Sequence, residues 1–539
     1  MKRARLLVAI PAIAVLGAVV APLVWAGVGA LRGDVGSRWA RLNGVILDRM
    51  VNSFVLGIGC ALVSTLFGLA LVWAVHRREF FGRRLLGAIY VAPLLVPPHI
   101  HTVSWMRVFG RQGYLSNWLH DHWGWQFDIR RGFVDVGGAP VFFPGTMMIM
   151  VSAFWPLAAL VISAGFRQIA PRQEEAAIVA VGRRRAFRGV TLPLLAPHLW
   201  TAGFFVFIFA ITCYGVPALL DTPTIMLEVF FTSANVDPLA AWVIAIPLVA
   251  TTVAALLFVL LGGGRRVWEG RSLDPGRVTS AMRPRSATAG ILAWGILLVT
   301  AGWPLASLLH KAGGPETYRA IWNNVLPQVK ASLILAVVAG ITIAAAGLLV
   351  AGFANALGRR RGFLVEVLAL LPFAFPAVVV ALSLNEMWGS LSALRPDGLL
   401  DRWVYRGMGL PLIAYLALFL PFGVRGVRAT MTRLSPRPEE AAMVAGRGSL
   451  ATFTSVTLPR LAPGILAAFV LGYILTLGEL VAGLMVNTDR WQTAQARVFN
   501  MIHFSRDEEV AALCVMIALL ALVPTAIYAV AFNRRVEVL

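Results

Sequence analysis

The chain alternates between long apolar runs and short polar segments from end to end. A helix that crosses a membrane needs roughly 20 mostly apolar residues, and a segment in hydrocarbon must satisfy its own backbone hydrogen bonds. The pattern therefore predicts an all-α membrane protein with about twelve transmembrane helices. These runs lie near 6–29, 51–75, 85–108, 144–166, 199–219, 239–262, 289–309, 331–356, 364–388, 409–424, 464–486 and 508–532.

A polar, arginine-rich stretch at 263–288 divides these runs into two sets of six. We expect a first half at 1–262, a cytoplasmic linker at 263–288 and a second half at 289–539. The third and ninth runs contain internal prolines, which predict kinks there. Those prolines are Pro93, Pro97, Pro98, Pro372 and Pro376.

One long sequence pattern occurs once in each half. EEAAIVAVGRRRAFRGVTLPLLAP occupies 174–197, and EEAAMVAGRGSLATFTSVTLPRLAP occupies 439–463. Their Leu-Pro pairs begin at Leu192 and Leu458, so the repeat interval is close to half the chain. Each copy lies between the fourth and fifth spans of its half, and six spans per half place both copies on one side of the membrane. Such a parallel duplication predicts a pseudo-two-fold axis along the membrane normal.

The distribution of basic residues predicts which side that is. With the N-terminus in the cytoplasm, most of the 47 lysine and arginine residues lie in cytoplasmic segments, as the positive-inside rule requires. We expect the segments 76–84, 167–198, 263–288, 357–363 and 425–463 to face the cytoplasm. The first apolar run is long for the apolar core of a signal peptide, so we expect it to be retained as a span.

Composition excludes several other classes of protein. The chain is 58% hydrophobic and 14% charged, whereas soluble domains are about 45–50% apolar and about 25% charged. The net charge of +21 comes from short clusters between apolar runs and forms no stripe of the kind that binds nucleic acid. None of the three lysines lies in a phosphate-binding G-x-x-x-x-G-K-[ST] loop. The three cysteines show no paired spacing, and no cluster suggests a metal or a catalytic site, so we expect neither an active site nor a resident cofactor.

Each copy of the repeated pattern predicts a short helix, a bend and a second helix at the cytoplasmic surface. Carboxylates in the first turn complement the positive end of a helix, and alanine favours the helix that follows. Gly182 in the first copy, and Gly446 or Gly448 in the second, permit the bend. Phe187 and Phe453 supply apolar anchors. The alternative is a loop without a partner, and two copies at equivalent places argue against it.

The order Glu-Ala-Ala, Gly, Phe, Leu-Pro resembles the EAA loop of permease subunits of importer-type ABC transporters. The segments 92–119, 213–220 and 477–486 resemble the branch that includes iron(III), thiamine and aminophosphonate permeases. The resemblance implies a fused, two-domain, multi-pass permease of the bacterial inner membrane. In that family the EAA loop docks on a cytoplasmic ABC ATPase, and a periplasmic solute-binding protein delivers the solute. We expect two ATPase copies, which bind ATP and Mg²⁺, and no cofactor in this chain.

The resemblance also implies a set of ATPase-coupling residues in the first EAA loop (174–197) and the second EAA loop (439–463). These are Glu174, Glu175, Ala176, Gly182, Phe187, Leu192, Pro193, Glu440, Ala441, Gly446, Phe453, Leu458 and Pro459. The first copy is one residue shorter before its Phe, so either Glu174 or Glu175 corresponds to Glu440.

Five residues in the spans are candidates for the solute pathway: Cys213, Tyr214, Glu479, His99 and His101. The interval between the two Leu-Pro pairs places Cys213 opposite Glu479. A carboxylate at this depth is tolerable only where it faces protein or water, so Glu479 either meets the solute or serves as partner to a helix end. His99 and His101, two positions apart, point to different faces of a helix, and both packing and solute contact remain open for them.

An ion-gradient-driven secondary transporter is the alternative function, and a membrane scaffold is a weaker third. Secondary transporters often carry inverted repeats and several buried carboxylates, whereas this chain has a parallel repeat and few carboxylates in its spans. The family often has an acidic residue where Cys213 stands here. Iron(III), thiamine, a phosphonate and a polyamine therefore all remain open as the solute.

Overall fold

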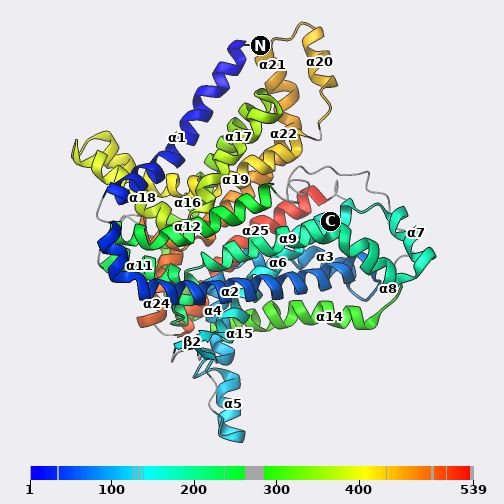
Figure 1. Ribbon diagram of the computed structural model, residues 1–539, viewed down its shortest axis with the longest axis vertical. Coiled ribbons are helices and arrows are strands. Elements are labelled where there is room, and N and C mark those ends of the chain that lie inside the picture. Colours follow the sequence, from blue (N-terminus) through cyan, green and yellow to red (C-terminus); the bar gives the residue numbers. More distant parts are fainter. Residues whose placement is uncertain are drawn as a thin grey trace.

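Helices make up almost all of the computed structural model (Figure 1), which describes residues 2–32, 35–125, 128–130, 134–136, 139–235, 237–261, 284–432, 434–486, 491–504 and 507–533. A short antiparallel hairpin, β1 (Val134–Val136) with β2 (Ala139–Phe142), lies between α5 and α6. The first-half helices are α1 (Lys2–Arg32), α2 (Val35–Arg77), α3 (Arg83–Ile89), η1 (Ala92–Leu95), α4 (Pro98–Phe109), α5 (Tyr114–Trp123), α6 (Pro144–Gln168), α7 (Pro171–Val181), α8 (Arg183–Ala186), η2 (Phe187–Thr191), α9 (Leu192–Ile211), α10 (Gly215–Leu219), α11 (Ile225–Asn235) and α12 (Pro238–Leu261).

The second half repeats this order of elements. Its helices are α14 (Ala287–Leu297), η4 (Leu298–Gly302), α15 (Trp303–Lys311), α16 (Pro315–Ala356), α17 (Gly358–Leu370), η5 (Leu371–Ala374), α18 (Ala377–Ala393), η6 (Leu400–Tyr405), α19 (Gly409–Met431), α20 (Arg437–Val444), α21 (Ser449–Thr452), η7 (Phe453–Thr457), α22 (Leu458–Gly478), α23 (Val481–Met485), α24 (Ala494–Phe504) and α25 (Asp507–Asn533). The all-α membrane architecture predicted from the sequence is confirmed.

The described residues do not establish the predicted count of twelve spans. Among the described residues, nine helices are long and apolar enough to cross a membrane, or eleven if each of two bent pairs counts as one span. The helix α25 covers the last predicted run but is not among the nine. The twelve-span prediction is therefore not confirmed.

The two bent pairs are the predicted third and ninth spans. The chain turns by 98° before α4 and by 97° before α18. Each turn is a 3-10 helix followed by extended backbone at Val96-Pro97 or Phe375-Pro376. Proline lacks a backbone N–H and disfavours helical backbone in the residue before it. The kinks predicted at these prolines are confirmed, and they are sharp enough to divide each span into two helices.

A core of three mutually packed helices lies in each half: α2, α6 and α9 in the first, and α16, α19 and α22 in the second. Glycines permit the closest crossings. A Cβ added at Gly68 would lie 2.8 Å from the backbone nitrogen of Ala159 on α6, and one at Gly347 would lie 2.5 Å from the carbonyl carbon of Gly423 on α19. Small residues at such crossings let helix backbones approach one another in lipid.

Hydrogen bonds repeat between the halves as well. The Ser53 hydroxyl accepts a hydrogen bond from the backbone N–H of Ile225 at 3.0 Å, and the Ser332 hydroxyl accepts one from Ala494 at 2.7 Å. The interval from Ser53 to Ser332 equals the interval from Gly68 to Gly347. The duplication thus extends from the sequence motif to the packing of the helices.

The first helix of each half lies against the other half. The helix α1 packs on α16, α18 and α19, while α14 and α15 pack on α2 and α4. Trp155 in the first core donates a hydrogen bond to Thr300 of the second half at 2.9 Å. The halves are therefore interlocked. Most of the predicted linker lies outside the described residues, so its boundaries stay a prediction.

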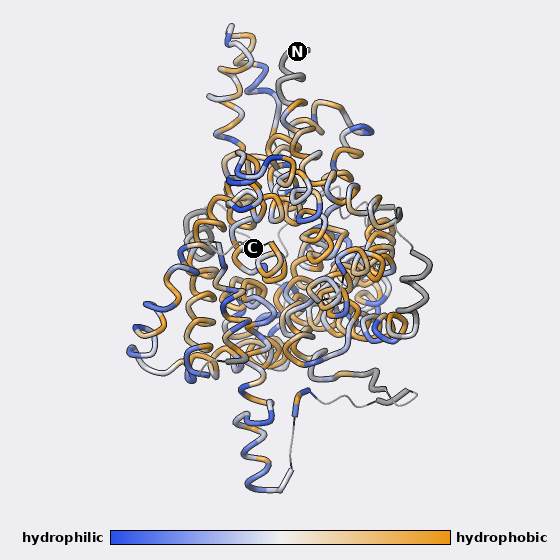
Figure 2. Tube along the Cα trace, turned by 90° about the vertical axis from the view of Figure 1, so that its left-hand side faces the viewer, coloured by the Kyte–Doolittle hydropathy of each residue, from blue (hydrophilic) through white to orange (hydrophobic). Residues whose placement is uncertain are grey.

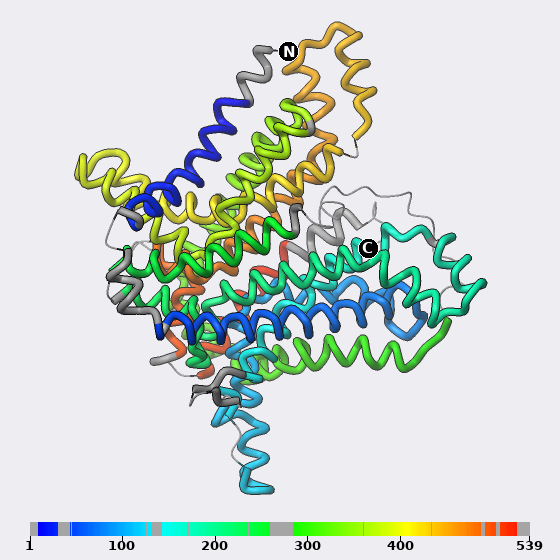
Figure 3. The backbone as a smooth tube through the Cα atoms, in the orientation of Figure 1, coloured from blue at the N-terminus to red at the C-terminus, as the bar shows by residue number. Residues whose placement is uncertain are grey.

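The two cores diverge from the region of α11 and α24 (Figures 1 and 3). In consequence α7 and α20, which begin the two EAA loops, lie at the ends of separate arms, while α5 projects away from both. Figure 2 shows hydrophobic residues along the helical body and hydrophilic residues in the projecting segments.

The close crossings predict a specific sensitivity to added side-chain volume. Gly68→Val and Gly347→Val should each lower the free energy of unfolding by about 1–3 kcal/mol, because backbone atoms cannot yield to the added carbons. Thermal unfolding of the purified chain in detergent measures this effect. Gly17→Val on α1 is the control for helix propensity, since nothing lies within 4 Å of a Cβ there. Equal loss of stability in all three variants would contradict the proposed crossings.

Candidate functional site

Both EAA loops turn at a glycine with a positive φ angle. Gly182 ends α7 with φ of 78°, and Gly446 follows α20 with φ of 83°. A side chain is strained in this region of backbone space even where there is room for it. Pro193 and Pro459 lie in the first turns of α9 and α22, where a missing N–H costs little. The second segment of each loop is the N-terminal end of the following span.

A buried carboxylate fastens the first EAA loop to its core. Glu174 is 5% exposed. Its two oxygens lie 3.0 and 2.9 Å from Arg77 Nε, and Oε2 lies 2.6 Å from Arg77 Nη2. The Thr191 hydroxyl donates to Oε1 at 3.2 Å. Charge-assisted pairs of this kind fix geometry strongly, so α7 is tied to the end of α2 and the start of α9.

Aromatic contacts complete the attachment of the first EAA loop. The half-buried Phe187 ring meets Trp73 of α2 edge-on, with ring centroids 6.4 Å apart. The guanidinium of Arg78 lies 4.6 Å from the Trp73 ring, and that of Arg77 lies 5.1 Å from the ring of Phe166 on α6. The loop, α2 and α6 therefore form one packed unit.

The second EAA loop lacks this attachment. No residue of α20 is buried, and Glu439 and Glu440 form no ion pair with another described residue. Phe453 is 38% exposed. By the interval that relates Gly68 to Gly347, the residue of the second half that corresponds to Arg77 is Ala356, which is uncharged. A cation nearby on α19, Arg428, pairs instead with Glu366 of α17.

The remaining coupling candidates lie on the loop surfaces. Glu175 is half-buried, Ala176 and Ala441 are exposed, and Leu192 and Leu458 are half-buried. The runs PRQEEAA at 171–177 and PRPEEAA at 436–442 place Glu174 at the position of Glu439. Sequence reasoning missed Arg77 and Thr191. The basic run at 76–84 drew attention to Arg77 only as a topology signal.

Helix breaks meet near the centre of the molecule. The helices α9 and α22 end at Ile211 and Gly478, and the short helices α10 and α23 follow them. A Cβ on Gly215 would lie 3.1 Å from His99 Cβ and 3.3 Å from Leu480 Cδ2. The predicted continuous spans at 199–219 and 464–486 are therefore broken, and the breaks of the two halves lie beside one another.

Glu479 lies at one of these breaks and completes the start of α23. Its Oε1 accepts hydrogen bonds from the backbone N–H groups of Val481 at 2.9 Å and Ala482 at 3.1 Å. The first N–H groups of a helix have no partner within the helix. Of the two roles considered for Glu479, partner to a helix end is the one that this geometry supports.

The other pathway candidates are packed. His99 Nε2 lies 2.5 Å from Gln495 Oε1, and the Gln495 amide donates to the Leu477 carbonyl at 2.7 Å, so the pair joins the two halves. His101 donates to the Pro93 carbonyl at 3.0 Å and closes its 3-10 turn. Tyr214 is buried, and Cys213 is half-buried. Among the described residues, no group of three His, Cys, Asp or Glu side chains could hold a metal ion.

The capping role of Glu479 predicts how substitutions there behave. Glu479→Ala should lower the free energy of unfolding by about 1–2 kcal/mol, because two N–H groups lose their acceptor. Glu479→Gln keeps an acceptor oxygen and should cost little. Thermal unfolding in detergent separates the two, with Glu386→Ala as a control because Glu386 is exposed on α18. Equal melting of Glu479→Ala and the parent protein would rule out the capping role.

The sequence of this chain is similar to those of known transport proteins. The family described as binding-protein-dependent transport system inner membrane component matches residues 336–538. A ferric transport system permease protein of Actinobacillus pleuropneumoniae is 22% identical over 492 residues, 85% of this chain and 67% of that protein. An Fe(3+)-transport system permease protein of Haemophilus influenzae is 21% identical over 477 residues, 84% of each chain.

Shorter permeases match one part of the chain. A sulfate transport system permease protein of Salmonella typhimurium is 30% identical over 215 residues, which are 38% of this chain and 76% of that protein. The relatives of this chain are subunits of ABC importers and work with an ATPase and a periplasmic binding protein. The chain belongs to the family of binding-protein-dependent transport system inner membrane components, and it is a multi-pass inner-membrane permease subunit of an ABC importer rather than an ion-driven secondary transporter.

Proposed function

We propose that this chain is the complete membrane pathway of an iron(III) importer, with one ABC ATPase docked on each EAA loop. The observation that supports iron(III) as the solute is the share of this chain that each kind of relative matches. Relatives named as ferric permeases match 84–85% of this chain, whereas the sulfate and molybdenum permeases match 38% and 28%. A fused ferric permease accounts for both halves at once.

Two docking loops on one chain support a stoichiometry of two ATPases to one permease. The loops end separate arms, so the approach of two ATPases would draw the arms together. The first loop would pass this motion to α2 and α9 through Glu174 and Arg77. The chain itself would bind no nucleotide and carry out no catalysis, since ATP and Mg²⁺ belong to the ATPases.

The opposite end of the molecule suits a periplasmic partner. The helix α5 projects away from both EAA loops (Figure 1) and carries the exposed indoles of Trp118 and Trp123. Tryptophan is enriched at protein interfaces because it combines a large apolar surface with a polar N–H. We assign this projection to the contact with the solute-binding protein.

The function is tested by reconstitution. Proteoliposomes that contain this chain, its ATPase and the iron-loaded binding protein should accumulate radioactive iron only when ATP is present. Parallel vesicles receive sulfate, molybdate, thiamine, a phosphonate or a polyamine with the matching binding protein. ATP-dependent uptake of one of these without uptake of iron would refute the assignment of iron(III).

The different attachment of the two loops predicts unequal effects of matched substitutions. Glu174→Gln leaves the buried Arg77 without a counter-charge, a change that costs about 3–5 kcal/mol. It should therefore reduce ATP-driven uptake far more than Glu439→Gln, whose half-buried carboxylate has no ion-pair partner among the described residues. Uptake per correctly folded molecule is the measurement.

A double substitution provides the control for the ion pair. Arg77→Met combined with Glu174→Gln removes both charges, and it should restore part of the stability lost in Glu174→Gln alone. If Glu174→Gln and Glu439→Gln reduce uptake equally, the Arg77–Glu174 pair does not carry the coupling.

A further inference from the structure

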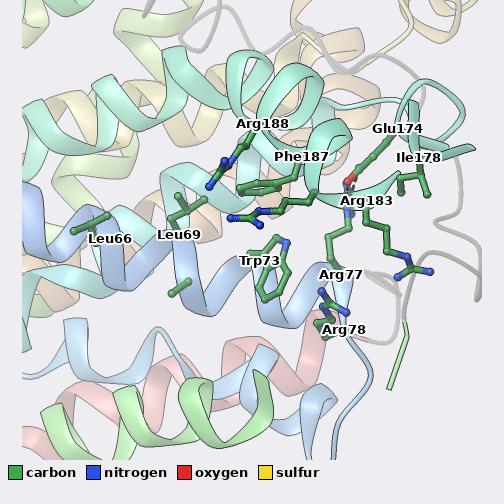
Figure 4. A pocket seen from close by; sticks show the side chains of 12 residues that line it. Leu66, Leu69, Trp73, Arg77, Arg78, Glu174, Ile178, Arg183, Phe187 and Arg188 are labelled. Atoms are coloured by element: carbon green, nitrogen blue, oxygen red, sulfur yellow. Dashed lines mark hydrogen bonds and ion pairs between the residues drawn. The ribbon is translucent and has the colours of Figure 1, made fainter. Parts of the chain in front are cut away.

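A cavity of about 610 Å³ lies between the cytoplasmic end of α2 and the first EAA loop (Figure 4). In the close-up, Phe187 and Arg188 reach from the loop toward Trp73 and Leu69 on α2. The cavity is partly open to its surroundings. Its lining residues are Leu66, Leu69, Ala70, Trp73, Arg77, Arg78, Glu174, Ile178, Arg183, Arg184, Phe187 and Arg188.

The inner end of this cavity is apolar and belongs to a membrane span. Leu66, Leu69 and Ala70 lie within the apolar helix Ile46–Arg77. Leu66 is 63% exposed, so this wall faces the surroundings of the helix, which are lipid acyl chains at this depth. A ligand that fills the whole cavity must therefore have an apolar portion.

The outer end carries an excess of positive charge. Glu174 is the only carboxylate among the lining residues, and Arg77 already neutralises it. Arg184 and Arg188 form no ion pair with another described residue. Burial and, to a smaller extent, the nearby charge of Arg183 lower the pKa of Arg78 below its usual value, because this cation is partly removed from water and has another cation close by. A negatively charged group would relieve this crowding.

In the proposed function both EAA loops dock an ATPase, but the second loop has no arginines at these positions. The interval between the two Leu-Pro pairs places Ser449, Leu450 and Thr454 where the first loop has Arg183, Arg184 and Arg188. The positive-inside rule requires cytoplasmic arginines, but it does not require that they converge on one cavity with an apolar wall. The arginines of the first loop therefore have a task that the second loop lacks.

We propose that this cavity binds an anionic phospholipid of the cytoplasmic leaflet. The phosphate lies among Arg78, Arg184 and Arg188, and an acyl chain lies along Leu66 and Leu69. Arginine forms strong hydrogen bonds with phosphate oxygens, and basic pockets beside membrane helices on the cytoplasmic side bind lipid headgroups. The bound lipid bridges α2 and the first EAA loop, so it strengthens the same connection as the Arg77–Glu174 pair. This site is independent of the identity of the transported solute.

The test measures lipid binding by the full-length chain. Native mass spectrometry of the detergent-solubilised protein is carried out while phosphatidylglycerol or phosphatidylcholine is titrated in. Phosphatidylglycerol should bind more tightly than phosphatidylcholine. Arg184→Leu with Arg188→Thr, which gives these positions the residues of the second loop, should weaken the binding of phosphatidylglycerol by about 30-fold.

Arg185→Ala is the control, because it removes one positive charge from the same loop, half the charge removed by the double variant, at a residue that does not line the cavity. It should bind phosphatidylglycerol within about twofold of the parent protein, since its charge acts from outside the site. Both variants should melt at the temperature of the parent protein. If Arg185→Ala and the double variant weaken the binding of phosphatidylglycerol equally, the effect comes from general surface charge and the proposed site is wrong.

Two further results would also overturn the proposal. One is displacement of phosphatidylglycerol by an equal concentration of inorganic phosphate, which would identify a site for free phosphate. The other is a double variant that binds lipid as the parent does but no longer binds the ATPase in lipid-free detergent, which would assign these arginines to the ATPase interface. If the parent protein binds phosphatidylglycerol as expected but takes up no iron, this result would count against the proposed solute alone.

Discussion

The need to satisfy every backbone group within the membrane governs where the helices of this protein can break. An N–H or C=O group in hydrocarbon costs several kcal/mol if it is left without a partner. The chain nevertheless breaks helices at equivalent places in both halves, at Pro97 and Pro376 and again after α9 and α22. Each break is at least half-buried in protein, and Glu479 supplies the acceptor that α23 needs. Breaks gathered at the centre are tolerable only because the two halves cover one another.

The interlocking of the halves follows from the same constraint. A three-helix core of α2, α6 and α9 leaves the breaks exposed on one side, and the elements that cover them come from the other half. Gln495 of the second half reaches both His99 and the end of α22, while Trp155 and Thr300 join the first core to η4. Fusion into one chain keeps these partners at a fixed ratio and a high effective concentration.

The sequence predicted the class, the duplication and the position of both EAA loops, because apolar run length and a twice-repeated motif are local signals. It did not predict the breaks at 97 and 376, because proline in a span is compatible with either a kink or a full break, and the packing of other helices decides. The sequence also did not predict the ion-pair partner of Glu174. Arg77 lies 97 residues away in a basic run, and the topology rule already explained that run.

Duplication followed by fusion leaves the two EAA loops free to differ, and their differences all point in one direction. The first loop has a buried carboxylate, an arginine to receive it and a basic cavity beside it, while the second has Ala356, an exposed Phe453 and no matching arginines. In the proposed arrangement, two ATPases that move together need at least one rigid connection to the membrane core. If both loops were held rigidly, neither could adjust its position to its ATPase as the two arms approach one another. The asymmetry therefore suits a transporter in which the first loop transmits the motion and the second follows it.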